Sequence, residues 1–219
     1  MDIGQVLVGI GLGLISIERA AKGLKAADPQ WRKAERVVVR DASGRTLTAV
    51  YENIRTLDQR VARIVRLVRR GAKDPRVRRF ALQVLGKRCG EDWCVRERDY
   101  WGEVVAIFDT VRQGVRYVRD QAGCDTFQAA GNTIEWKGGD CDDYAILLGS
   151  ILQSVGYPVA LRVVKTKGAT EWNHIYLMVG LPPSAPTEWR ALDASVPEPA
   201  GWEVPAGDLD EWCDYEVAA

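Results

Sequence analysis

From residue 53 onward, the hydrophobic pattern of this 219-residue chain changes period once, near Gly156. Before that glycine, apolar residues recur at helical spacing in residues 57–68, 77–85, 100–115 and 144–155. After it come three short β-prone runs, 159–164, 174–179 and 188–193, separated by connections that contain Gly or Pro. Such runs are typical of an antiparallel sheet. A block of helices followed by a block of strands predicts an α+β fold, and the loop-like residues 126–139 lead into its last helix.

Residues 1–52 precede this pattern, and we treat them as an N-terminal extension of a main domain that covers residues 53–219. Two β-branched-rich runs at 36–40 and 46–51 flank a turn segment that ends in Gly44, which predicts a β-hairpin.

An apolar run from Val6 to Ile17 is broken only by glycines and one serine. It is shorter than the roughly 20 residues that span a bilayer, and no Lys or Arg precedes it as a secretory signal requires. We therefore expect no membrane span and no export, which places the protein in the cytoplasm of a bacterium or of an infected host cell. A buried helix fits the run, as does an arm within residues 1–20 that binds a second copy or an assembly partner.

The charges balance at 30 basic and 30 acidic residues but are unevenly distributed. Residues 55–88 hold twelve Lys or Arg against two acids, and residues 186–219 hold nine acids against one Arg. We expect solvated faces that partly neutralise each other. The alternative is an acidic partner, including nucleic acid, bound through Arg60, Arg63 and Arg70.

The chain has five cysteines, an odd number that leaves at least one thiol free. Cys89 and Cys94 lack the spacing of a zinc site, and the chain has a single histidine, so we expect neither a metal nor a cofactor. In a cytoplasmic setting the cysteines are expected to be reduced. The states of Cys124 and Cys213 stay open.

Cys141 follows the sequence Gly138-Gly139-Asp140 at the start of the last helical segment. Asp140 is a good N-cap, so Cys141 takes the first helical position, where free N–H groups and the helix dipole lower a thiol pKa. The glycines let a substrate approach the backbone, and the Cys141 amide can help to bind an oxyanion. The alternative is a small buried residue at a helix start, and the acids at 142 and 143 oppose a thiolate.

His174, the only histidine, opens one β-prone run, and Asp193 closes the next. Antiparallel pairing of these runs would bring the carboxylate beside the imidazole, where it could fix the tautomer of the ring. Each residue also has an ordinary explanation, as a packed histidine and a turn-forming aspartate.

Taken in order, Gly-Gly-Asp-Cys-Asp-Asp, then Asn-His, then Trp-Arg-Ala-Leu-Asp resembles the transglutaminase-like superfamily of papain-type thiol hydrolases over residues 95–196. The resemblance implies that Cys141 is the nucleophile, His174 the general base and acid, and Asp193 the orienting acid, with the cysteine helix packed on an antiparallel sheet. Trp136 and Tyr117 are candidates for the oxyanion donor.

Trp172 is a candidate for lining the cleft, and any of the three aromatic rings could instead be core filling. Similar small proteins occur in phage and prophage genomes, so the resemblance also implies a viral or prophage origin.

The chemistry that follows from this resemblance is acyl transfer at the amide bond of a protein or peptide-like substrate, without a cofactor. We expect hydrolysis by a peptidase or amidase, and transamidation shares the same acyl-enzyme. The alternative is a structural or assembly protein, such as a phage virion component, that keeps the fold.

Overall fold

The computed structural model describes residues 5–7, 35–40, 46–54, 56–120 and 124–218, and its chain divides into two compact units. The first unit comprises residues 1–59 and 120–127, and the second comprises residues 60–119 and 128–219.

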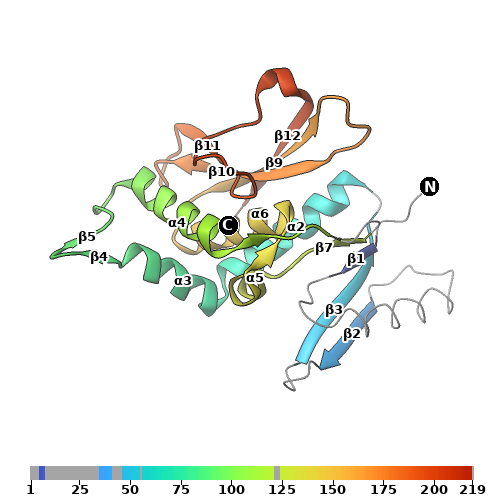
Figure 1. The fold of residues 1–219 in the computed structure, drawn as a ribbon, viewed down its shortest axis with the longest axis horizontal. Helices are drawn as coiled ribbons and strands as arrows, with labels where there is room; N and C mark the ends of the chain where they lie inside the picture. The colour runs from blue at the N-terminus through green and yellow to red at the C-terminus, as the bar shows by residue number, and fades with distance from the viewer. Residues whose placement is uncertain (1–4, 8–34, 41–45, 55, 121–123, 219) are drawn as a thin grey trace. The chain divides into compact units, whose positions relative to one another are not determined.

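The first unit contains a four-stranded sheet in the order β2-β3-β1-β7 (Figure 1). β2 (Glu35–Arg40) pairs antiparallel with β3 (Thr46–Asn53). β1 (Gln5–Leu7) pairs antiparallel with β3 and parallel with β7 (Cys124–Thr126). Apart from its first two residues, which belong to β1, the apolar run lies outside the described residues.

Three amphipathic helices form the first half of the second unit. α2 (Leu57–Ala72) and α3 (Pro75–Leu85) each bury one apolar stripe, and α4 (Tyr100–Gly114) buries Val104, Ile107, Phe108 and Val111. Asp74 caps α3 by accepting a hydrogen bond from the Arg76 backbone N–H at 2.9 Å, with Pro75 at the first helical position. The predicted helical spacing is therefore confirmed for all three helices.

The central helix is α6 (Cys141–Ser154), in which every residue from Asp142 to Leu152 is buried. It packs against two strands of a sheet and against α3, α4 and α5 (Figure 1). Packing on all sides explains why its sequence is almost uniformly apolar.

The segment before α6 is only partly the loop that its sequence predicts, and the prediction is wrong for its second half. This half contains the short helix α5 (Ala130–Trp136), which ends at Lys137 in the left-handed conformation (φ 55°). The two-residue strand β8 (Gly138–Gly139) follows and pairs parallel with β6 (Arg116–Tyr117). A seven-residue helix with Ala at its N-cap carries too little periodicity to be recognised in a sequence.

The sheet that packs on α6 has the order β11-β10-β9-β12 (Figure 1). β9 (Val159–Thr166), β10 (His174–Leu181) and β11 (Glu188–Leu192) are the three predicted strands, and all neighbours pair antiparallel. The sequence pattern missed β12 (Leu209–Val217), which follows the 3-10 turn Ala206–Asp208 and pairs with β9. Several acidic residues interrupt the apolar pattern of β12, so its sequence does not indicate a strand. Two of these acids form ion pairs with β9, namely Asp214 with Arg162 and Glu211 with Lys165.

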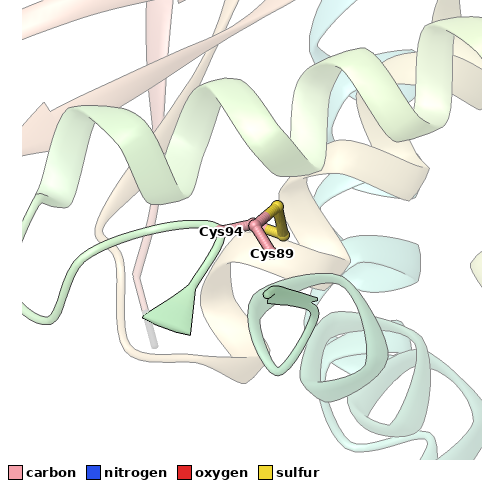
Figure 2. Close-up of a disulfide and its surroundings, with 2 residues drawn as sticks. All are labelled: Cys89 and Cys94. Carbon is pink, nitrogen blue, oxygen red and sulfur yellow. A yellow bond between two sulfur atoms is a disulfide. The ribbon is translucent and has the colours of Figure 1, made fainter. Parts of the chain in front are cut away.

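A small hairpin of β4 (Arg88–Cys89) and β5 (Asp92–Trp93) connects α3 to α4, and a disulfide joins Cys89 to Cys94 across it (Figure 2). The Cα atoms of the two cysteines lie 4.8 Å apart. The expectation that both are reduced is therefore wrong. The turn at Gly90 (φ 74°) folds the chain back and brings together two thiols that are only five residues apart.

Within the described residues, no helix is both long enough and apolar enough to cross a membrane.

Candidate active site

Cys141 is the first residue of α6, as its sequence context predicts. Asp140 is the N-cap, with extended backbone dihedrals, and its carboxylate accepts the Asp143 backbone N–H at 3.5 Å. Gly139 is required here for space, because a Cβ at this position would come within 2.6 Å of the Asp143 side chain. The backbone before the cysteine therefore lies unusually close to the first turn of α6.

The helix start is predicted to lower the pKa of the Cys141 thiol, but in the structure that pKa is raised. Burial raises the pKa of Cys141 to about 12, and the neighbouring Asp140 carboxylate adds to the rise. Hydrogen bonds from the backbone N–H groups of Ile175 and Asp142 act in the opposite direction. At neutral pH the resting side chain is a thiol, and a thiolate requires help from a base.

The hydrogen bond from Ile175 also defines where the nucleophile candidate lies. Ile175 is the second residue of β10, directly after His174. Cys141 at the start of α6 and His174 at the start of β10 are therefore brought to the same end of the packed helix and sheet.

His174 and Asp193 are in direct contact. Nε2 of His174 lies 2.6 Å from Oδ2 of Asp193, whose side chain is only 3% exposed against 18% for the histidine. The strand register explains the contact. Leu177 on β10 pairs with Leu192 on β11, so the next residue, Asp193, comes opposite Tyr176. His174 lies two residues before Tyr176 on the same face of the sheet, diagonally across from Asp193.

This contact sets the roles of the two imidazole nitrogens. A carboxylate only accepts hydrogen bonds, so Nε2 carries a proton and the Nδ1 lone pair of the neutral ring is left to take a proton from elsewhere. A base oriented by a buried acid is the arrangement that activates thiol nucleophiles.

Comparison with protein families identifies the segment that holds these residues. Residues 95–194 match the model of the transglutaminase-like superfamily. This segment is a transglutaminase-like domain. A comparison with curated proteins found no match.

Three solved structures are similar at low sequence identity. A candidate cysteine protease from Cytophaga hutchinsonii is 16% identical with a TM-score of 0.43, and the match covers 85% of this chain and 66% of that one. A candidate protease from Parabacteroides distasonis is 12% identical with a TM-score of 0.46, and the match covers 77% and 36%. EGTA-treated LapG from Legionella pneumophila is 19% identical with a TM-score of 0.38, and the match covers 68% and 77%. This chain thus spans less than two thirds of the length of the first two proteins.

Of the three aromatic candidates in the transglutaminase-like domain, Tyr117 lies near the thiol. Tyr117 pairs with Gly139 in the β6–β8 ladder and is 43% exposed. Its pKa is raised, first by burial and then by the charges of Cys141 and Asp140, which places the phenol within electrostatic range of the sulfur. Trp136 ends α5, Trp172 lies two residues before β10, and both are partly exposed. Their roles stay predictions.

Three carboxylates gather at the start of α6, with one oxygen each of Asp140, Asp142 and Asp143 within 4.8 Å of the others. Burial raises the pKa of Asp142 well above its usual range, and a hydrogen bond with Asp140 adds to the rise. Asp143 accepts two hydrogen bonds from Gln128 at 2.7 Å each.

Sequence reasoning missed two residues that support the site. Gln128, which holds Asp143, lies in the segment whose composition predicts a loop. Ser195 donates to Asp193 from its backbone N–H at 3.1 Å and from its hydroxyl at 2.6 Å. The order Asp-Ala-Ser after a strand was an available signal, because Asp side chains often accept from the backbone N–H two residues later.

Proposed function

We propose that the transglutaminase-like domain catalyses cysteine-dependent acyl transfer at an amide bond, with Cys141 as nucleophile, His174 as base and acid, and Asp193 as orienting acid. The observation that carries this proposal is the 2.6 Å contact between His174 Nε2 and Asp193 Oδ2, at the same end of the domain as Cys141. The contact directs the basic nitrogen of the only histidine in the chain away from the acid.

The first half of the reaction forms a thioester. Nδ1 of His174 takes the thiol proton while Sγ of Cys141 bonds to the substrate carbonyl carbon, whose π electrons move to the oxygen. The backbone N–H groups at the start of α6 stabilise this oxyanion, and the Tyr117 hydroxyl is the candidate second donor. The carbonyl then re-forms, the C–N bond breaks, and the amine leaves with the proton from His174.

In the second half, His174 takes a proton from water as the water oxygen attacks the thioester, and the C–S bond breaks to return the thiol. A primary amine in place of water gives transamidation with the same proton transfers. We propose hydrolysis as the main reaction, since water is the acceptor that is always present.

The raised pKa of Cys141 decides how the base must act. A thiol with a pKa of about 12 is almost wholly protonated at pH 7, so proton transfer to His174 must accompany attack. Removal of His174 should therefore slow the reaction most at neutral pH. Its effect should shrink at alkaline pH, where hydroxide ionises the thiol without a base.

The test is acylation of Cys141 by p-nitrophenyl acetate, a small acyl donor that needs no specificity pocket. Peptide mass spectrometry locates the acetyl group, and nitrophenolate release gives the rate. The variants are Cys141→Ala, His174→Ala and Asp193→Asn, with Cys213→Ala as the matched control because Cys213 is also a free cysteine. Denatured casein then tests hydrolysis of an amide, and added dansylcadaverine tests transfer to an amine.

We expect acetylation at Cys141, a loss of about a hundredfold or more in His174→Ala at pH 7, and a wild-type rate in Cys213→Ala. If Cys141 is not acylated, or if His174→Ala acylates as fast as the wild type, the catalytic proposal is wrong. A binding or assembly role for the same fold would then take its place.

A further inference from the structure

The Asp193 carboxylate is buried, and its two oxygens have separate partners. Oδ2 faces His174, whereas Oδ1 accepts the backbone N–H and the hydroxyl of Ser195. The hydroxyl contact is the shorter of the two at 2.6 Å, a length typical of an O–H donor on an ionised carboxylate.

We infer that Ser195 is a positioning residue for the proposed reaction, acting on His174 through Asp193. This inference rests on the function proposed above. A carboxylate group is planar, so fixing one oxygen fixes the direction of the other. Two donors from one residue hold Oδ1, and Oδ2 is thereby aimed at Nε2 of His174.

The same two donors also stabilise the negative charge on Asp193. When His174 takes the thiol proton, the imidazolium needs a charged partner at Nε2, and the Ser195 hydroxyl helps to keep the carboxylate in that form. The serine thus has both an orienting and an electrostatic effect on the base, without contact with the reacting atoms.

A purely structural role for Ser195 predicts a different result. The backbone N–H bond closes the turn after β11, and every substitution except proline retains it. If Ser195 only closes this turn, loss of its hydroxyl can change the stability of the protein. It will not change the pH dependence of the reaction at Cys141.

The experiment measures acylation of Cys141 by p-nitrophenyl acetate from pH 6 to pH 10. Threonine and valine side chains have nearly the same shape and differ in the hydroxyl, so Ser195→Thr and Ser195→Val form a matched pair, and Ser195→Ala removes the hydroxyl without added bulk. Ser154→Ala is the control, because Ser154 donates to a backbone carbonyl at 2.7 Å at the far end of α6. Circular dichroism establishes that each variant is folded.

We expect Ser195→Ala and Ser195→Val to acylate about tenfold more slowly at pH 7, the effect of losing one charge-assisted hydrogen bond. Their rates should rise steadily toward pH 10, as base assistance gives way to ionisation of the thiol by hydroxide. Ser195→Thr should recover most of the neutral-pH rate, and Ser154→Ala should match the wild type.

Equal rate profiles for Ser195→Val and Ser195→Thr would overturn the inference, while a large loss in His174→Ala would leave the proposed function standing. If the rate profile of His174→Ala matches that of the wild type, both the role of Ser195 and the proposed function are wrong. A folded Ser195→Thr with a low rate would count against a role for the hydroxyl, even where Ser195→Val fails to fold.

Discussion

Asp143 and Gln128 form a two-point contact, in which the Gln128 backbone N–H reaches Oδ1 of Asp143 and the Gln128 side-chain amide reaches Oδ2, each at 2.7 Å. The same amide donates to the Gly138 carbonyl at 3.1 Å. Gln128 therefore holds the glycine pair and the first turn of α6 together, on either side of Cys141.

Asp143→Ala should lower the free energy of unfolding by about 2 kcal/mol, because it leaves buried N–H donors of Gln128 unsatisfied. Urea unfolding followed by tryptophan fluorescence measures the loss. Glu97→Ala is the control, since that side chain is 86% exposed and its removal should change stability by less than about 0.5 kcal/mol. Equal stabilities for the two variants would show that the contact with Gln128 contributes little.

Alkaline pH should destabilise the fold through Cys141. Its folded pKa of about 12 lies above the ordinary value of 9.0, so between these values the unfolded chain binds fewer protons than the folded one. Stability that is fully present below pH 9 is lost as the pH rises toward 12, at about 1 kcal/mol per pH unit from this group.

The test compares the urea concentrations at which half of the wild type and half of Cys141→Ala are unfolded, at pH 8 and at pH 10.5. The variant should lose less stability over that interval than the wild type, and Cys213→Ala controls for the removal of a thiol as such. The same slope in Cys141→Ala and the wild type would mean that the folded protein does not raise the pKa of Cys141.

Gly71→Ala should destabilise the protein by about 1–3 kcal/mol, because α2 crosses α6 at this glycine. A Cβ there would lie 2.7 Å from the Cβ of Ser150 and 3.1 Å from that of Ala130. Gly114→Ala at the last residue of α4 is the matched control, with nothing within 4 Å of the new methyl group, and should be neutral or slightly stabilising. Thermal unfolding of both variants measures the difference in stability. If Gly71→Ala is as stable as the wild type, α2 and α6 can move apart at this position.

Reduction of the Cys89–Cys94 disulfide should cost about 2 kcal/mol or less, since the two cysteines are only five residues apart in sequence. Both strands of the hairpin are exposed, so no core contact depends on them. Urea unfolding with and without a phosphine reductant measures the difference, and Cys141 acylation should not change. A loss above about 4 kcal/mol would mean that the hairpin supports α3 and α4 more than its exposure indicates.

Much of the second unit could be predicted because its signals are local. Helical spacing in α2, α3 and α4, the N-cap at Asp140 and the β-prone runs at β9 to β11 all lie within short stretches of sequence. The pairing of β10 with β11 followed from their order in the chain, and the contact between His174 and Asp193 followed from that pairing.

The features that could not be predicted depend on tertiary context. The acids of β12 are compensated by Arg162 and Lys165 on the neighbouring strand, which no local pattern reveals. The pKa of Cys141 depends on how deeply α6 is packed, and burial outweighs the helix start that sequence reasoning emphasised. The pairing of Cys89 with Cys94 depends on the turn between them.

The position of β12 has a consequence for the order in which the protein can fold. β12 completes the sheet by pairing with β9, in a register that joins Val217 to Val159, although β10 and β11 lie between them in the sequence. A ribosome therefore translates Cys141, His174 and Asp193 before it releases the strand that closes their sheet. Until then the eight-residue β9 has one unpaired edge, which leaves the nascent chain open to wrong strand pairing.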